Sequence, residues 1–216
     1  MTGIAIQIYL IGLLIGVAFV PLAIKPVSWH RSLARATPLT LFSIAAWSAD
    51  ASPFFIAAMV FAAAGDLAHS REGRAPYLYG IAAFSLTHLC LTLAFAAVSG
   101  GAVWDAFVLA PLAAISVLAL AFSTEVWLIW HTGALRWPVR TYVGLALIMV
   151  LSALTLPTGG LLVQIGAVLF IVSGILLAGR RFRMPPDSRW AQSAAQLGWG
   201  LYLMGQALIM WGFVLF

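Results

Sequence analysis

The residues best suited to chemistry in this sequence are ionisable groups that stand alone inside long apolar runs. Asp66 lies within the run VFAAAGDLA, and the next charged residue along the chain is Arg71. His88 lies near the middle of a later apolar run, and Glu125 lies within another. An ionisable side chain at membrane depth is costly, so it tends to face a protein interior or a wet cavity and to serve a function. These three residues are therefore the first candidates for catalysis.

Each of the three also has a purely structural interpretation. Asp66 could be a hydrogen-bond partner or an acid at the membrane interface, and His88 could be a neutral packing group between helices. Glu125 could pair with a neighbouring cation or with His131. The elements that position these side chains must decide between the two interpretations.

The composition indicates an integral membrane protein. The chain has 216 residues, of which 63% are hydrophobic and 8% are charged, and its mean hydropathy is +1.06. A soluble domain is about half apolar and about a quarter charged. The formal net charge of +5 would suggest a nucleic-acid partner in a soluble protein, but here the cations lie between apolar runs, where they set topology and meet anionic lipid. We therefore expect one polytopic domain over residues 1–216 and no nucleic-acid partner.

The sequence also lacks the motifs of soluble enzymes and of metal sites. There is no nucleotide-binding loop, no GxSxG elbow and no HExxH helix. Cys90 is the only cysteine, so disulfides and cysteine metal sites within the chain are excluded. An isolated aspartate with scattered histidines is no metal-ligand constellation, and we expect neither a metal nor a cofactor.

The apolar runs predict an all-α fold, a bundle of eight transmembrane helices, because a span requires about 20 apolar residues. The second predicted helix has the shortest apolar core; it could begin earlier, near Ser32, with Arg35 snorkelling to the interface. Pro111 is a candidate kink in the fifth. The helices are expected over residues 4–24, 34–49, 53–70, 76–98, 105–131, 138–156, 159–179 and 190–215.

The distribution of cations supports this count of helices. Eight helices leave seven loops, and all eleven cations fall on the odd-numbered ones. By the positive-inside rule these loops are cytoplasmic and both termini lie on the non-cytoplasmic side. The abundance of arginine and alanine hints at a bacterial gene, so the expected location is a bacterial inner membrane. The cations are Lys25, Arg31 and Arg35 in loop 1, Arg71 and Arg74 in loop 3, Arg136 and Arg140 in loop 5, and Arg180, Arg181, Arg183 and Arg189 in loop 7.

This topology converts positions in the sequence into depths, at about 1.5 Å per residue. Asp66 then lies about 7 Å inside the cytoplasmic face, and Glu125 and Ser173 lie in a similar layer. His88 and Tyr202 lie about 18 Å inside, near the midplane. The polar groups are thus expected to cluster in the cytoplasmic half and the middle of the bundle.

Two further features are expected near this cluster. Gln206 follows Tyr202 by four residues, so both could line a cavity or bond to a neighbouring helix. Gly80 lies across a predicted helical hairpin from Asp66 and would leave room beside its carboxylate.

Several short blocks, in order, resemble the YhhN-type lysoplasmalogenases, a family of eight-helix membrane proteins. Together they cover most of the chain from Lys25 to Gln206, and their order and spacing are more specific than any single block. The blocks are Lys25 with Pro26, Gly65 with Asp66, the spaced set Tyr77, Gly80, Phe84 and His88, then Pro138, Val139, Tyr142 and Met149, then Gly166, Ala167, Phe170 and Ser173, and finally Tyr202 with Gln206.

The resemblance implies hydrolysis of the vinyl ether bond of a single-chain lysophospholipid, which yields a fatty aldehyde and a glycerophospho-head group. A buried carboxylic acid suits this chemistry, because protonation of the vinyl ether carbon forms an oxocarbenium ion that water attacks. A second carboxylate could stabilise that cation, as paired acids do in glycoside hydrolysis. Taken with the depths, the resemblance assigns these site residues: Asp66, His88 and Glu125 for catalysis, and Ser173, Tyr202, Gln206, Tyr142 and Arg71 for substrate binding.

The sequence departs from the family at one position of this site. The family block usually reads serine–aspartate, whereas here Ser173 is followed by Gly174. The second carboxylate is therefore missing, and Glu125, at a similar depth, is the hypothetical substitute.

Two other functions stay open, a non-catalytic lipid-binding protein and a small-molecule transporter. A transporter requires a passage open to both faces, and the sequence shows no inverted repeat and no matching pair of broken helices. The enzyme requires a cavity that opens to the cytoplasmic side. Several arginines at that side could hold a lipid phosphate, although the setting of topology also explains them. They are Arg71, Arg74, Arg180 and Arg181.

Overall fold

The computed structural model describes residues 3–214, and all regular secondary structure within that range is helical, as the sequence predicts. Short 3-10 segments, η1 to η4, lie between several of the α-helices. The α-helices are α1 (Gly3–Ala18), α2 (Trp29–Ser48), α3 (Pro53–His69), α4 (Arg74–Ser99), α5 (Ala106–Leu109), α6 (Pro111–Trp127), α7 (Arg136–Leu154), α8 (Leu161–Arg183) and α9 (Arg189–Phe213).

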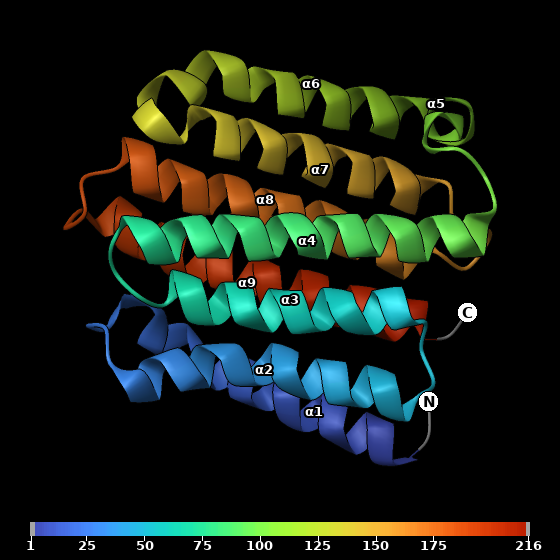
Figure 1. The fold of residues 1–216 in the computed structure, drawn as a ribbon, viewed down its shortest axis with the longest axis horizontal. Helices are drawn as coiled ribbons and strands as arrows, with labels where there is room; N and C mark the ends of the chain where they lie inside the picture. The colour runs from blue at the N-terminus through green and yellow to red at the C-terminus, as the bar shows by residue number, and fades with distance from the viewer. Residues whose placement is uncertain (1–2, 215–216) are drawn as a thin grey trace.

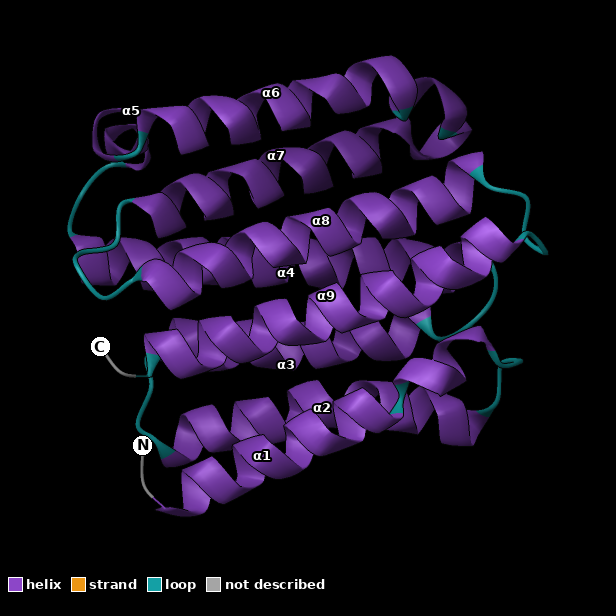
Figure 2. Ribbon diagram, turned by 180° about the vertical axis from the view of Figure 1, so that it is seen from behind, coloured by secondary structure: helices purple, strands orange, loops and turns teal. Residues whose placement is uncertain are grey.

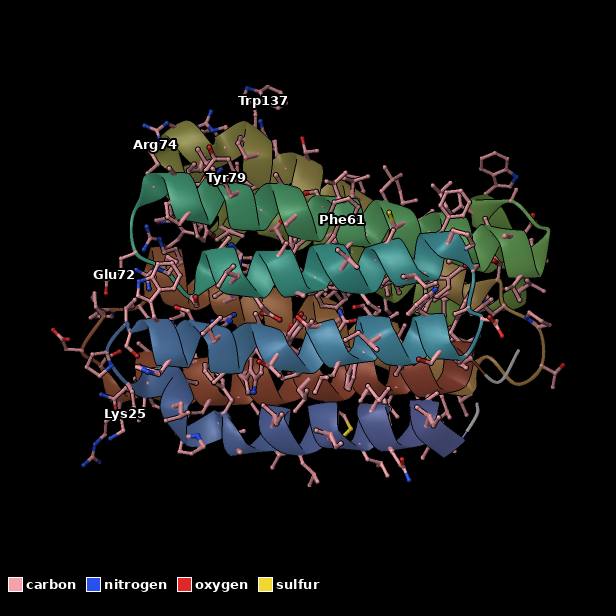
Figure 3. The ribbon with its side chains drawn as sticks, turned by 60° about the horizontal axis from the view of Figure 1, so that its bottom comes forward. Lys25, Phe61, Glu72, Arg74, Tyr79 and Trp137 are labelled. Atoms are coloured by element: carbon pink, nitrogen blue, oxygen red, sulfur yellow. The ribbon has the colours of Figure 1, made fainter. Side chains whose placement is uncertain are left out.

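Successive long helices run in opposite directions in one bundle (Figure 1). α1 begins and α9 ends at the same end of the bundle. Seen from behind, α8 and α9 cover the face of the bundle opposite α4 and α3 (Figure 2). α6 lies at one edge of the bundle beside α7. Lys25, Glu72 and Arg74 lie together at the end opposite the start of α1 (Figure 3). The predicted gathering of odd-numbered loops at one end is therefore seen in the fold.

Serine caps set where several helices begin. The Ser28 hydroxyl accepts a hydrogen bond from the Arg31 N–H at 3.2 Å, so α2 begins at Trp29 rather than at the predicted residue 34. Ser52 caps α3 in the same way, with Pro53 at the first helical position. The earlier start of α2 places Arg35 well inside a helix, and this decides the geometry of the site.

Prolines divide two of the predicted helices. The helix expected over residues 105–131 is split before Pro111, where Ala110 has φ −143° and ψ 62°. Proline has no N–H to donate and its ring disfavours the helical conformation of the residue before it, and here Ala110 leaves that conformation and a new helix begins at Pro111. α1 likewise ends at Ala18, and a 3-10 segment that contains Pro21 continues to Ile24. Residue 215, the predicted end of the last helix, lies outside the described residues.

The outer surface of the bundle is apolar. Leu112 and Val126 on α6 are 82% and 79% exposed, although side chains of this kind are normally buried in soluble proteins. Within residues 3–214, four segments are long and apolar enough to cross a membrane, and two of these extend α6 and α7 slightly. α1 and α3 are apolar but shorter. The four segments are Arg74–Ser99, Pro111–His131, Gly133–Leu154 and Leu161–Arg183.

Candidate functional site

The site is centred on Asp66, whose side chain is completely buried where α2, α3 and α9 meet. Arg35 on α2 donates from Nε to Asp66 Oδ1 at 3.2 Å. The Tyr202 hydroxyl on α9 donates to Asp66 Oδ2 at 2.7 Å. Both carboxylate oxygens therefore have a partner, and one of these partners is a cation. The sequence predicts both Asp66 and Tyr202 for the site, but it places Tyr202 about 11 Å deeper in the membrane, whereas the two side chains are in direct contact.

Sequence reasoning missed the inward direction of Arg35, which it expected to snorkel to the interface. The Arg35 side chain is only 16% exposed, and its guanidinium lies 5.3 Å from the ring centre of Trp199. The spacing of Arg35, Leu39 and Phe42 contained the signal, because residues three and four apart share one face of a helix. Leu39 and Phe42 are fully buried, so that face points into the bundle.

Asp66 lines a cavity, the Asp66 cavity, that encloses about 590 Å³, part of it open to the outside. Tyr142 and Ser173, both predicted site residues, also line it, but the Ser173 hydroxyl already donates to the Phe170 carbonyl oxygen at 2.7 Å. A Cβ at Gly174 would lie 2.9 Å from the Tyr142 hydroxyl. The tyrosine therefore uses the space that a side chain at position 174 would need.

A second cavity, the apolar groove, adjoins the first and spans about 780 Å³ of empty space, part of it open to the outside. Its lining comes mainly from α6, α7 and α8 and is almost wholly apolar, as with Val117, Leu120 and Ile171. Tyr142 and Gly174 line both the groove and the Asp66 cavity. The groove and the Asp66 cavity therefore meet at these two residues, although Asp66 itself does not line the groove.

A third cavity, the basic mouth, lies at the end of the bundle where α3 ends and α8 gives way to the loop before α9. Leu177 is common to all three cavities, and Arg180 lines both the mouth and the Asp66 cavity. Arg71, the predicted substrate-binding cation, also lines the mouth. The lining of the mouth is His69, Arg71, Gly73, Tyr77, Leu177, Arg180, Arg181, Met184 and Pro186.

Two predicted site residues are buried behind the wall of the Asp66 cavity. His88 is fully buried, and its ring centre lies 5.0 Å from that of Tyr142 and 4.7 Å from that of Phe170. Gln206 is also fully buried, and its side-chain amide, like the His88 ring, makes no hydrogen bond within residues 3–214. Neither residue lines the Asp66 cavity, so His88 can reach the cavity only through the rings it contacts.

Glu125 is not brought to Asp66. Its side chain is 42% exposed and pairs with Arg140, with Nη2 of the arginine 2.6 Å from Oε2 of the glutamate. Its neighbours Thr124 and Ala121 line the apolar groove, but Glu125 does not. The two acids have similar predicted depths, but the rise per residue does not specify the face of α6 on which Glu125 lies.

Gly80 also has a different neighbour from the one expected. A Cβ at Gly80 would collide with the imidazole ring of His69, not with Asp66. Gly65 in turn leaves room for the Phe84 ring, because a Cβ at Gly65 would lie 2.8 Å from that ring. These glycines allow α3 and α4 to approach and pack aromatic rings beside the site. Among the described residues, no three His, Cys, Asp or Glu side chains are placed to hold a metal ion.

Comparison with known proteins identifies the family. The model of the YhhN family matches residues 30–213. The chain is 29% identical over 193 residues to proteins named uncharacterized membrane protein YhhN from Escherichia coli O6:H1, Escherichia coli O157:H7 and Shigella flexneri. Each match covers 85% of this chain and 89% of the relative. No solved structure matches. The apolar helices and these relatives together identify an integral membrane protein that belongs to the YhhN family.

Proposed function

We propose that this protein hydrolyses the vinyl ether bond of a single-chain lysophospholipid by acid catalysis. The observation that carries the proposal is the fully buried Asp66, bound to Tyr202 and Arg35 in a cavity that adjoins an apolar groove. A hydrocarbon chain in the groove would bring its first carbons to the carboxyl group. A buried acid with no lipid-accessible cavity beside it would have had only a structural use.

The reaction consumes one water and returns the acid to its starting state. Asp66 gives its proton to the vinyl carbon farther from the ether oxygen, and a C–H bond forms as the double bond becomes an oxocarbenium ion. The oxygen of a water molecule then bonds to the adjacent carbon, and the proton released by that water returns to the Asp66 carboxylate. The resulting hemiacetal separates into an aldehyde and a glycerol hydroxyl.

The neighbours of Asp66 suit both halves of this cycle. A tyrosine hydroxyl can accept a hydrogen bond from a carboxylic acid or donate one to a carboxylate, so Tyr202 can serve both protonation states. Arg35 would stabilise the carboxylate that forms when the proton leaves. Ser173 and Tyr142 would contact the substrate, and His88 would be a positioning residue that acts through the Tyr142 ring. The proposed cycle uses a single acid, since Gly174 provides no second carboxylate.

A specific observation favours one alternative, a lipid-binding protein without hydrolytic activity. Arg35 and Tyr202 both donate to Asp66, an arrangement that also suits a permanently ionised carboxylate. Gly174 adds no other acid to the cavity. Such a protein would keep the groove and bind the same lipid unchanged.

A substrate pair separates the two functions. The purified protein is incubated with a vinyl ether lysophospholipid and with its saturated ether analogue, and aldehyde release is measured. We expect release from the first lipid only, and its loss in Asp66→Asn but not in Asp50→Asn. Asp50 is a suitable control because its φ of 54° is a conformation that asparagine also adopts readily. Binding of both lipids without aldehyde release would establish the lipid-binding function instead.

We also propose that eight helices cross a bacterial inner membrane with the odd-numbered loops in the cytoplasm. The cations between the helices support this orientation. Alkaline phosphatase fused to the C-terminus should be active. A fluorescent protein that folds only in the cytoplasm, fused at the same place, should not fluoresce. The opposite pattern would reverse the orientation and place the basic mouth outside.

A further inference from the structure

We propose that the basic mouth is a phosphate-binding site that holds the head group of a single-chain lipid while the chain lies in the apolar groove. The inference rests on the proposed function for the identity of the lipid, and on separate observations for the phosphate. It assigns Arg180 and Arg181 to binding.

The mouth has the charge that a phosphate requires. Three arginines line it, and its lining contains no carboxylate. Arg71, Arg180 and Arg181 make no ion pair within residues 3–214, in contrast to Arg35 and Arg140. Arginine is the side chain best suited to phosphate, because its planar fork presents two parallel N–H groups. The described part of the chain therefore leaves these three cations uncompensated around one cavity.

Two of these arginines pack against aromatic rings, and these contacts do not occupy the N–H groups of the guanidinium. The Arg181 guanidinium lies 5.0 Å from the ring centre of Tyr77, and that of Arg71 lies 4.2 Å from the ring centre of Trp29. A guanidinium over an aromatic face keeps its N–H edges available, since these lie in its own plane. Arg71 gives one weak hydrogen bond, 3.4 Å long, to the Ser32 hydroxyl. The arrangement orders the cations and leaves donors for an anion.

The α8 helix connects the mouth to the acid. Leu177 follows Gly174 by three residues, and Arg180 and Arg181 follow Leu177 by three and four, so the four residues form one stripe along this helix. The stripe begins at the Asp66 cavity and ends in the mouth, and Leu177 lines all three cavities. Gly174 and Arg181 are separated by about 10 Å along the helix axis. A phosphate at the arginines would therefore place the glycerol unit near Leu177 and the start of the chain near Asp66.

The setting of membrane topology explains why cations lie at this end, but it does not explain why these three converge. Lys25, Arg74, Arg183 and Arg189 satisfy the positive-inside rule equally well and do not line the mouth. The absence of a carboxylate from the lining also bears on selectivity. An ammonium group on the lipid would find no acidic partner there, so the mouth should recognise the phosphate and tolerate either a choline or an ethanolamine head group.

Binding of a lipid that cannot be hydrolysed tests the inference independently of catalysis. A saturated 1-alkyl lysophospholipid and the matching 1-alkylglycerol, which lacks phosphate, are titrated into purified protein. In the double variant Arg180→Gln, Arg181→Gln we expect phospholipid binding to weaken about tenfold or more, with alkylglycerol binding unchanged. The control Arg183→Gln, Arg189→Gln removes the same charge at the same end of the bundle and should bind both lipids as the wild type does.

The remaining outcomes overturn the inference. Equal weakening for both lipids would show that the arginines only support the fold, and no weakening would show that the phosphate binds elsewhere. An equal loss of phospholipid binding in the control variant would mean that the net charge of this end of the bundle, not the two arginines of the mouth, determines binding. Inorganic phosphate that binds as tightly as the phospholipid would assign the mouth to free phosphate. Because the ether lipid is not cleaved, failure of the proposed hydrolysis would leave the expected binding pattern intact.

Discussion

Two carboxylate–arginine pairs in this protein have similar chemistry and opposite surroundings. Asp66 and Arg35 are 0% and 16% exposed, and they meet through one contact of 3.2 Å beside a cavity. Glu125 and Arg140 are 42% and 30% exposed, and they meet through several shorter contacts on the outside of the bundle. The second pair is the better ion pair by geometry, yet it lines none of the three cavities described above.

The difference shows that ion-pair geometry is a poor guide to a functional acid. Arg140 also lies 5.0 Å from the ring centre of Trp137, which is 72% exposed, an arrangement typical of a membrane interface. Asp66 has fewer polar contacts but lines a cavity that adjoins the apolar groove. The accessible cavity, rather than the acidic side chain alone, makes Asp66 the candidate for chemistry.

The sharpest test compares the two acids in the same assay. Asp66→Asn should lower aldehyde release by about 100-fold to 10,000-fold, the usual contribution of a general acid. Glu125→Gln should leave the rate within about twofold of the wild type, because its carboxylate lies outside the Asp66 cavity. The rate is measured per folded protein after size-exclusion chromatography. A large loss in Glu125→Gln would restore the two-acid mechanism and contradict the single-acid one.

The next test compares the two arginines by thermal unfolding in detergent. At a pH at which Asp66 is ionised, Arg35→Gln leaves its buried charge without a cationic partner and should destabilise the fold by about 3–5 kcal/mol. Arg140→Gln should lower the melting temperature much less, because water and the membrane interface can solvate the exposed Glu125 carboxylate once its partner is removed. Equal destabilisation by the two variants would mean that the buried pair contributes no more to the free energy of unfolding than the exposed pair does.

The smallest expected effect comes from the hydrogen bond between Tyr202 and Asp66. Tyr202→Phe keeps the ring that packs against Phe84 and Phe170 but removes a bond to a charged group, which usually contributes about 1.5–3 kcal/mol. We expect about a tenfold lower rate with a modest loss of stability. Tyr79→Phe is the matched control, because Tyr79 is 72% exposed and lines none of the three cavities. An unchanged rate in Tyr202→Phe would show that Arg35 alone supports the reacting acid.

The sequence by itself determined the helical fold and the end of the bundle at which the cations gather, and it predicts the depth of Asp66 in the membrane. These features are local or additive: hydropathy gives the helices, loop charge gives their direction, and the rise per residue gives depth. An error of a few residues at a helix boundary changes a depth by only a few ångströms, at about 1.5 Å per residue. Resemblance to the family added Tyr142 and supported Tyr202, which its position had already indicated, and both line the Asp66 cavity.

Only the tertiary structure decided which way each side chain faces. A shift of one residue turns a helical position by about 100°, so two acids at one depth can point inward and outward. Glu125 points away from the cavities, and Arg35 points inward because Leu39 and Phe42 on the same face are buried. Gly80 accommodates His69 rather than Asp66 for the same reason. Spacing within one helix shows which residues share a face, as with Arg35, Leu39 and Phe42, but packing against neighbours far away in the chain decides what that face meets.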